Sequence, residues 1–282
     1  MNTPSLKVTK TRDTTGILML ILLLAYLIAY ILPSNLRPLL IPDESRYAEI
    51  PREMIASGDW VEPHLVNLRY FEKPPLGYWL TAISIRLFGE NNFAVRLSSA
   101  LSIGLTAWFI WLLLIRSGYS PRKALLAAAI FLTLFEVFVI GTLAILDSPF
   151  ALLITAGMVL FYLASDTTEN RPRQRYYLSA SGVMFGLAFL TKGFLAFALP
   201  GIVLLPFILI TKHYNLLWRS AWVVLFAVLI ILPWGIAIQL HGSDFWHYFI
   251  WEEHIRRFLS KTAQHAAPFS FYFVALPVIT FP

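Results

Sequence analysis

One uncharged stretch near the amino terminus constrains the fold of this chain more than any other feature. Residues 15–33, TGILMLILLLAYLIAYILP, contain no charged side chain. A helix needs roughly 20 predominantly apolar residues to cross the hydrocarbon core of a bilayer. The residues that follow, SNLRPLLIPDE, offer no small-residue cleavage site of the kind that ends a secretory signal. The stretch therefore predicts an uncleaved membrane-spanning helix.

The same pattern recurs along the chain. Further apolar stretches occupy about 97–115, 123–142, 148–165, 178–191, 194–211 and 218–239, and another begins at 268. The stretches 178–191 and 194–211 are short or contain proline, which predicts a tilt or a break there. Hydrophobic residues make up 58% of the chain, against about half in soluble domains. We predict an all-α polytopic membrane protein with about seven to eight transmembrane helices, forming a single domain over residues 1–282.

Basic residues predict the orientation, because cytoplasmic loops of membrane proteins accumulate lysine and arginine. Four basic groups lie on one side if the spans alternate: Lys7, Lys10 and Arg12; Arg116, Arg122 and Lys123; Arg171, Arg173 and Arg175; Lys212 and Arg219. That side is predicted to be the cytoplasm, and the amino terminus lies in it. The net charge of +6 is then mostly a topology signal, and nothing in it indicates binding to nucleic acid.

Other charged residues gather on the opposite side, in two predicted outer loops over 34–96 and 240–267 and at the ends of spans. They are Asp43, Glu44, Glu72, Lys73, Asp147, Lys192, His247, His254, Arg256 and Arg257. A charge at the end of a span is costly unless it is paired, hydrated or used. Any single one, such as Asp147, is explained as well by an interfacial charge that reaches water. Their gathering at one face favours a site.

Two amphipathic helices are predicted in the first outer loop. The first begins at Asp43, which can cap it, and ends at Gly58. The second begins at Pro75 and ends at Gly89, with an apolar stripe along one face. Helices of this kind tend to lie in the plane of the membrane surface. A role as helix cap alone is the alternative interpretation of Asp43.

Several segments resemble the bacterial aminoarabinose transferases. They are PDESRY at 42–47, FEKPPLGYW at 71–79, LAILDSPFA at 143–151, LTKGF at 190–194 and FWHYFIWEEHIRRF at 245–258. Those enzymes add 4-amino-4-deoxy-L-arabinose to lipid A and belong, with the protein O-mannosyltransferases, to the GT-C class of membrane glycosyltransferases. The similarity runs from about residue 17 to the end. By this resemblance the chain looks like the amino-terminal half of a family member.

The resemblance implies a bacterial inner-membrane enzyme whose active site faces the periplasm. Such an enzyme takes a sugar from an undecaprenyl-phosphate carrier and transfers it to lipid A or a similar acceptor in the bilayer. Asp43 and Asp147 match acids at and near the reaction centre of the family. Lys73 and Lys192 match lysines that bind the donor phosphate. These positions are expected to form the reactive part of the site.

The same resemblance assigns four further positions. Arg46 and Tyr47 match residues that line the substrate pocket, and Glu72 and His254 match positions where a divalent ion can bind. A tight ligand pattern such as HExxH is absent from the sequence. Interfacial histidines explain His254 equally well. The sequence therefore requires no cofactor, and a divalent metal ion is kept as an open alternative.

The residue types suit sugar transfer even when the resemblance is left aside. A polyprenyl phosphate leaving group gains negative charge as the glycosidic bond breaks, so cations such as Lys73, Lys192 and Arg257 would stabilise it. A carboxylate such as Asp43 suits the role of base or orienting group for the acceptor. Attack opposite the leaving phosphate is expected to invert the anomeric carbon.

Other functions stay open. Transfer of another sugar, such as hexose, mannose or galacturonic acid, to lipid, glycan or protein fits the same residues. So does a noncatalytic subunit that binds polyprenyl phosphate, because three cations suffice for binding. A transporter of lipid-linked sugars is disfavoured, since its charges should lie near the bilayer midplane and its halves should show repeat symmetry.

Overall fold

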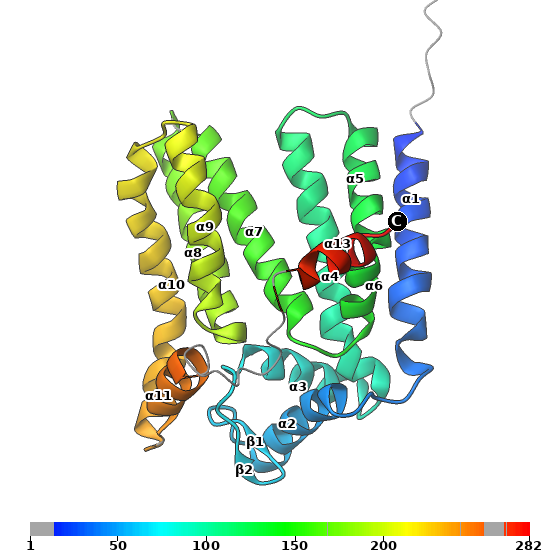
Figure 1. Cartoon of the computed structure of the whole chain (residues 1–282), viewed down its shortest axis with the longest axis vertical. Coiled ribbons are helices and arrows are strands. Elements are labelled where there is room, and N and C mark those ends of the chain that lie inside the picture. Colours follow the sequence, from blue (N-terminus) through cyan, green and yellow to red (C-terminus); the bar gives the residue numbers. More distant parts are fainter. Residues whose placement is uncertain (1–13, 168, 243, 257–267, 269) are drawn as a thin grey trace, which may run out of the picture.

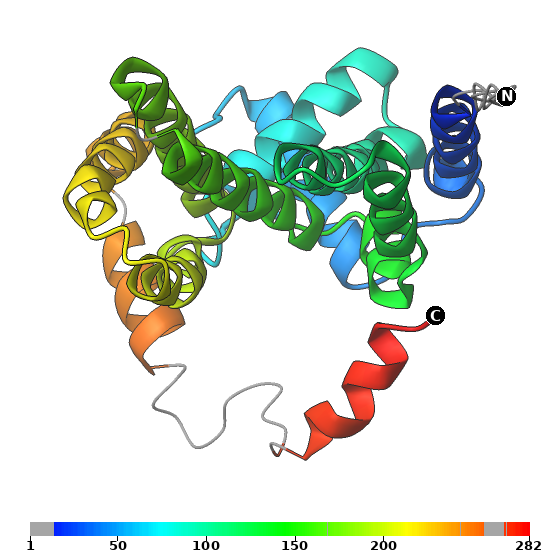
Figure 2. The same ribbon diagram turned by 90° about the horizontal axis from the view of Figure 1, so that it is seen from above.

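The computed structural model describes residues 14–167, 169–242, 244–256, 268 and 270–282. Figure 1 shows upright, roughly parallel helices above a layer of shorter elements. Neighbouring upright helices contact each other in the order α10, α8, α7, α4, α5 and α1, and α9 packs on α8 and α7. The view from above follows the same order (Figure 2). The predicted all-α polytopic architecture is confirmed.

The upright helices correspond to the predicted spans. They are α1 (Thr15–Tyr26), which continues through a π-helical turn (Leu27–Ile31) and a 3-10 turn (Leu32–Asn35), α4 (Asn92–Arg116), α5 (Pro121–Thr133), α6 (Phe135–Thr142), α7 (Asp147–Asp166), α8 (Arg171–Lys192), α9 (Leu195–Ile210) and α10 (Asn215–Leu240). Among the described residues, the run Thr15–Asn35 and helices α4, α7 and α10 are long and apolar enough to cross a membrane. The bent pair α5 and α6 makes a fifth candidate. The chain is a multi-pass membrane protein.

Three predicted spans differ in detail from the structure. The stretch 123–142 is bent by 67° between α5 and α6, because Leu134 has an extended backbone (φ −60°, ψ 132°). Helix α9 runs through Pro200 and Pro206 without the predicted break, since membrane helices tolerate proline where neighbours satisfy the backbone. Helix α8 begins earlier than predicted, where the Asn170 side chain accepts a hydrogen bond from the Arg173 N–H.

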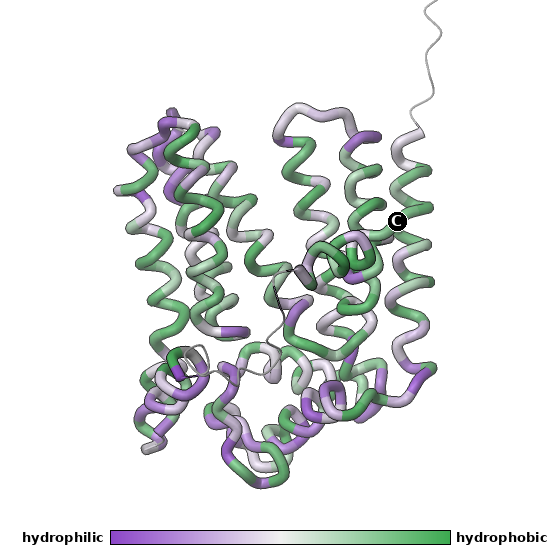
Figure 3. The backbone as a smooth tube through the Cα atoms, in the orientation of Figure 1, coloured by the Kyte–Doolittle hydropathy of each residue, from purple (hydrophilic) through white to green (hydrophobic). Residues whose placement is uncertain are grey.

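The segment after residue 268 also differs from its prediction. It forms α13 (Phe271–Ile279), a helix of nine residues rather than a full span. Helix α13 contacts α6, and the Phe135 N–H donates to the Phe281 carbonyl over 2.7 Å. In Figure 3 the apolar residues cover the middle of the upright helices, and the hydrophilic ones gather at the upper ends and in the lower layer.

The lower layer holds the predicted outer loops. Its elements are α2 (Asp43–Ser57), β1 (His64–Leu65), β2 (Leu68–Arg69), α3 (Leu76–Phe88), α11 (Phe245–His247) and the π-helical segment Tyr248–Arg256. Helix α2 ends at Gly58, whose φ of 74° suits glycine. Asp43 is the first helical residue and makes no capping hydrogen bond, so its predicted cap role is wrong.

Helix α3 confirms the predicted second helix of the loop, from Pro75 to Gly89. Its buried face consists of small and polar residues together with Tyr78 and Ile85. The apolar stripe is uncovered in its later part, where Ile83 and Leu87 are 49% and 71% exposed, whereas Leu76 and Trp79 at its start pack against the core. An uncovered stripe of this kind is expected of a helix that lies in the membrane surface.

Hydrogen bonds hold the lower layer together and join it to the upright helices. The Trp234 Nε1–H of α10 donates to the Val61 carbonyl over 3.0 Å, which joins the two layers. Within the lower layer, the Trp79 Nε1–H of α3 donates to the Trp60 carbonyl over 2.7 Å. The β1–β2 turn is held by the Glu53 carboxylate of α2, which accepts from the N–H groups of residues 66 and 67. The outer loop is thus fixed as a floor below the bundle.

Candidate active site

Arg46 of α2 contacts acidic and aromatic side chains of α2 and of the segment that holds Tyr70 and Glu72. Its Nη2 donates to Asp43 Oδ1 over 2.6 Å, and its Nη1 lies 3.8 Å from Glu72 Oε2. Its guanidinium carbon lies 5.4 Å from the ring centroid of Tyr47 and 5.9 Å from that of Tyr70. Its Nε is buried and has no hydrogen-bond partner among the residues described. A buried donor left unpaired costs roughly 1–3 kcal/mol, so Arg46 has donor capacity that the protein itself does not use.

The pKa of the Tyr47 hydroxyl is raised by burial and by the acidic residues of the site. Burial raises the pKa of its hydroxyl to about 12; Arg46 opposes this shift, and the carboxylates of Asp147, Asp43 and Glu72 add to it. A hydrogen bond from the Ala144 N–H to the Glu44 carboxylate, over 2.9 Å, holds the start of α7 close to the start of α2. The structure therefore brings together five of the predicted residues, Asp43, Arg46, Tyr47, Glu72 and Asp147.

Asp147 and Lys192 form an ion pair at the ends of two helices. Asp147 is the first residue of α7 and Lys192 is the last residue of α8. The Lys192 Nζ donates to Asp147 Oδ1 over 2.7 Å. The Asp147 side chain is 53% exposed, whereas that of Lys192 is 19% exposed. One carboxylate oxygen of Asp147 is left open beside a fixed ammonium group.

Lys73 occupies a different part of the site. Its Nζ donates to the Glu72 carbonyl over 2.9 Å and lies 3.7 Å from Glu253 Oε2 in the segment Tyr248–Arg256. The Tyr70 hydroxyl donates to Glu72 Oε2 over 2.6 Å. Burial and this hydrogen bond to Glu72 raise the pKa of Tyr70. Lys73 and Lys192 thus have separate acidic partners on separate elements.

The metal interpretation finds no support in the described residues. Glu72 is already bound by Tyr70 and lies beside Arg46. Within the described ranges, no three His, Asp or Glu side chains form a group that could hold a metal ion. The side chain of His254 and all of Arg257 lie outside the described residues. The predicted roles of these two therefore stay predictions.

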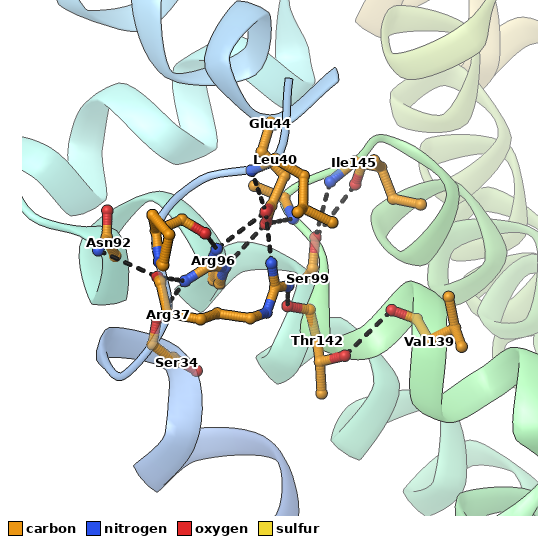
Figure 4. A network of polar contacts seen from close by, with 12 residues as sticks. Ser34, Arg37, Leu40, Glu44, Asn92, Arg96, Ser99, Val139, Thr142 and Ile145 are labelled. Atoms are coloured by element: carbon orange, nitrogen blue, oxygen red, sulfur yellow. Dashed lines mark hydrogen bonds and ion pairs between the residues drawn. The ribbon is translucent and has the colours of Figure 1, made fainter. Parts of the chain in front are cut away.

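Sequence analysis missed a buried network that joins the start of α2 to the segment before α7 (Figure 4). The Glu44 carboxylate accepts from Arg96 Nε and Nη2 over 2.7 and 2.8 Å, and from Arg37 Nη1 over 2.8 Å. It also accepts from the N–H groups of Leu40 and Ala144, each over 2.9 Å. Glu44 and Arg96 are both 0% exposed. Glu44 is therefore enclosed and saturated.

The network fixes the pKa of Glu44 as well as its position. Burial by itself raises this pKa, but the hydrogen bonds from Arg96, Leu40, Ala144 and Arg37 outweigh burial and lower it to about 2. Arg96 uses its remaining N–H groups on the carbonyls of residues 34, 37 and 38. The bond to Ala144 ties the segment before Asp147 to the start of α2. Glu44 thereby positions both neighbouring acids.

A weak signal for Arg96 exists in the sequence. The apolar stretch that predicts the second span begins at 97, so Arg96 looks like a charge at the end of that stretch, although α4 begins at Asn92. An arginine inside a membrane helix is costly without a partner. That cost indicates a buried acid nearby but does not say which one.

Comparisons with known proteins identify the family of the chain. The profile of the dolichyl-phosphate-mannose-protein mannosyltransferase family matches residues 16–249. The undecaprenyl phosphate-alpha-4-amino-4-deoxy-L-arabinose arabinosyl transferase of Aeromonas salmonicida is 47% identical over 250 residues, which are 88% of this chain and 46% of that protein. A protein of Proteus mirabilis with the same name, numbered 2, is 44% identical over 261 residues, covering 92% of this chain and 46% of its own length. The chain spans about half the length of the curated relatives it matches.

Solved structures show the same fold. ArnT from Cupriavidus metallidurans in the apo state has a TM-score of 0.83 and 29% identity, covering 95% of this chain and 48% of that one. The same protein bound to undecaprenyl phosphate has a TM-score of 0.81 and 30% identity, with coverage of 95% and 49%. The S. cerevisiae Pmt1-Pmt2 protein O-mannosyltransferase complex shares the fold at a TM-score of 0.57 and 18% identity, with coverage of 87% and 35%. The GT-C fold is confirmed, and the chain belongs to the dolichyl-phosphate-mannose-protein mannosyltransferase family.

Proposed function

We propose that this chain acts in the transfer of 4-amino-4-deoxy-L-arabinose from undecaprenyl phosphate to lipid A. The observation that carries the proposal is that two partly exposed carboxylates lie at the same end of the bundle: Asp43 pairs with Arg46 at the start of α2, and Asp147 begins α7, whose preceding segment is bonded to the start of α2. Similarity to ArnT bound to undecaprenyl phosphate supports the donor, and the names of the relatives support the sugar. The acceptor rests on the resemblance to the aminoarabinose transferases alone.

Lys192 and Lys73 are proposed to meet the donor phosphate. Each ammonium group is held close to a carboxylate, so it is fixed before a ligand arrives. Fixed cations stabilise the charge that develops on the leaving phosphate without reorganisation during the reaction. Asp147 keeps Lys192 in place and is itself half exposed. Arg257 is proposed as a third cation for the same phosphate.

Asp43 is proposed to serve the acceptor. An acceptor oxygen forms a bond to the anomeric carbon while the bond from that carbon to the donor phosphate oxygen breaks, and the electron pair leaves with the phosphate. A proton on the attacking oxygen passes to Asp43, whose side chain is 59% exposed. Attack opposite the phosphate inverts the anomeric carbon. No bond between enzyme and sugar forms.

Arg46 and Tyr47 are proposed to line the pocket between donor and acceptor. The buried Nε–H of Arg46 has no partner in the described part of the chain, so we expect its guanidinium group to turn when an anion binds. Glu72 makes hydrogen-bonded and ionic contacts with Tyr70 and Arg46. It is therefore assigned to holding the Arg46 side chain, and no step passes through a metal ion.

We also propose that the site faces the periplasm of a bacterial inner membrane. The basic ends of α4, α5, α8 and α10 lie at the opposite end of the bundle from α2 and α3 (Figure 1), and such ends remain in the cytoplasm. The sequence contains no cysteine, so single cysteines report the topology cleanly. In intact spheroplasts, Ser57→Cys should react with a membrane-impermeant maleimide and Tyr119→Cys should not. The reverse pattern would overturn the orientation.

Mass spectrometry of lipid A tests the function directly. The host cells lack their own aminoarabinose transferase and express this chain, its Asp43→Asn variant, or a chimera with the remaining part of the Aeromonas salmonicida relative. A gain of one aminoarabinose that disappears when Asp43→Asn is introduced into the same active protein supports the proposal. Undecaprenyl phosphate binding without transfer by the chimera would favour a noncatalytic binding role. A different added mass would identify another sugar.

A further inference from the structure

A small hollow lined by arginines lies at the other end of the bundle from the candidate active site. It has a volume of about 100 Å³ between α8 and α10, and its lining is Arg171, Gln174, Arg175, Leu178, Arg219 and Trp222. Helix α8 begins at Arg171 and α10 at Asn215, both at the end away from α2 and α3 (Figure 1). One water occupies about 30 Å³ in the liquid. The hollow therefore has room for about three waters or one small anionic group.

The walls of the hollow are two helices in close contact. Helices α8 and α10 run in the same direction, and Gly182 and Gly186 of α8 face the backbone of α10. A Cβ atom at Gly182 would overlap the Val223 carbonyl oxygen, and one at Gly186 would crowd that of Ala227. Small residues four positions apart let membrane helices approach this closely. The side chains at the starts of both helices are consequently fixed relative to each other.

The arginines of the hollow are anchored, yet their charge is not neutralised. Arg219 donates through Nη1 to Gln174 Oε1, and Gln174, which is 2% exposed, donates to the Ala164 carbonyl over 2.8 Å. The Arg175 guanidinium carbon lies 5.6 Å from the Trp222 ring centroid. Within the described ranges, neither Arg219, Arg175 nor Arg171 forms an ion pair with a carboxylate. The hollow is therefore strongly positive.

Helix dipoles increase this positive potential. Arg171 and Arg175 lie in the first two turns of α8, and Arg219 lies in the second turn of α10. Cations are disfavoured near helix N-termini, where the dipole is positive and anions are favoured. Membrane topology explains why basic residues lie at this end. It does not explain why three of them line one hollow with a buried glutamine that orients one of them.

We propose that this hollow binds the phosphate group of an anionic ligand, with the headgroup of an anionic phospholipid as its source. Guanidinium groups donate paired hydrogen bonds to phosphate oxygens. Basic pockets between transmembrane helices bind such headgroups, and tryptophan prefers the headgroup level of the bilayer, where Trp222 would lie. The site is separate from the proposed sugar-transfer site and does not depend on it.

Arg173 supplies a matched control for the test. It lies on the same helix and carries the same charge, but it does not line the hollow, and its guanidinium donates to the Tyr177 hydroxyl over 3.2 and 3.3 Å. The chain is purified in a neutral detergent and titrated with phosphatidylglycerol or phosphatidylcholine, and bound lipid is counted by native mass spectrometry. Arg175→Gln should weaken phosphatidylglycerol binding about tenfold or more, the loss expected when a hydrogen bond to a charged group is removed. Arg173→Gln should leave it nearly unchanged.

Two further variants protect the test against misfolding. Arg219→Gln should weaken binding at least as much as Arg175→Gln, but it also frees Gln174, so its unfolding temperature is measured in parallel. Arg171→Gln removes a side chain that makes no hydrogen bond in the described part of the chain, and it should weaken binding without changing the unfolding temperature. Equal losses for Arg173→Gln and Arg175→Gln, or no loss for any variant, would overturn the proposal.

Inorganic phosphate identifies the source of the ligand. Excess phosphate that fails to displace phosphatidylglycerol supports the lipid headgroup. Phosphate that displaces it from the parent chain, with weaker phosphate binding in Arg175→Gln, supports the phosphate site and assigns it to a soluble ligand. Equal binding of phosphatidylcholine and phosphatidylglycerol would show that the net negative charge of the headgroup is not recognised, and would overturn the proposal.

Discussion

Asp43 and Glu44 are neighbours in the sequence but belong to two very different regions of the molecule. Glu44 is 0% exposed and accepts hydrogen bonds from two arginines and two backbone N–H groups. The Asp43 side chain is 59% exposed and pairs with Arg46. Both regions contain acids and arginines. Of these two regions, and among the residues that the structure describes, the one around Asp43 leaves the Arg46 Nε–H without a partner, whereas the Glu44 carboxylate is fully bonded.

This difference separates two roles for the same residue types. A saturated buried carboxylate cannot bind a substrate without breaking the network, so Glu44 holds the start of α2 against the segment before α7. A half-exposed carboxylate contributes little to stability, since surface ion pairs are worth about 0–1 kcal/mol. The region around Asp43, Arg46 and Asp147, here called the open region, should therefore carry the chemistry. The network around Glu44 and Arg96, here called the closed region, should carry the stability. Substitutions can test each half of this statement.

The largest effect is expected for Asp43→Asn on sugar transfer. Loss of a general base lowers the rate by about 10²- to 10⁴-fold, whereas loss of an exposed pair should change the free energy of unfolding by less than about 1 kcal/mol. The transfer rate is measured from lipid A mass spectra, and stability from thermal unfolding in detergent. Full transfer by the variant would refute the assignment of Asp43 as base.

The next largest effect is expected for Arg96→Leu on stability. Arg96→Leu leaves Glu44 with Arg37 and two backbone N–H groups. It still breaks a fully buried ion pair and removes the donor to the carbonyls of residues 34, 37 and 38, so it should cost about 3–5 kcal/mol. Thermal unfolding of the purified variant measures this loss. The double variant Glu44→Leu with Arg96→Leu removes both fully buried charges. Arg37 then loses its carboxylate, but its side chain is 36% exposed, so the double variant should still recover part of the loss. A double variant no more stable than Arg96→Leu would show that the network contributes more than charge balance.

Acid should weaken the closed region. The Glu44 pKa is about 2 in the folded chain and 4.5 in an ordinary environment. A lowered acid pKa contributes stability above the unfolded value, and this contribution is lost as the pH falls from about 5 towards 2. The loss should approach roughly 3 kcal/mol. Unfolding temperatures measured over this range should fall less steeply for Glu44→Gln than for the parent chain; parallel slopes would contradict the assignment.

The sequence predicts the open region better than the closed one, for physical reasons. Asp43, Asp147 and Lys192 follow or precede apolar stretches, so their places at helix ends can be predicted from hydropathy. The glycine ends of α2 and α3 follow equally directly. The pairing of Asp147 with Lys192 joins residues 45 positions apart. This pairing depends on how α7 packs on α8, and no local sequence pattern predicts that packing.

The closed region depends on long-range packing throughout. Arg96 pairs with a carboxylate 52 positions away, and its position at the edge of an apolar stretch looks the same as that of an interfacial charge. The bend at Leu134 could not be predicted from the sequence either, because neither proline nor glycine lies there. Local sequence patterns predict where helices end. Buried polar networks and bends depend on contacts with residues far away in the sequence, which local patterns do not identify.

The smallest effect is expected for Lys192→Gln on donor binding. The Lys192 side chain is 19% exposed and shares its charge with Asp147, so its loss should weaken undecaprenyl phosphate binding only about tenfold, within the range of a hydrogen bond to a charged group. Binding is measured by native mass spectrometry in detergent. Lys212→Gln removes an equal charge at the opposite end of the bundle and should have no effect. If Lys192→Gln binds as tightly as the parent chain, Lys192 serves to hold Asp147, and the open region contacts the donor through Lys73 instead.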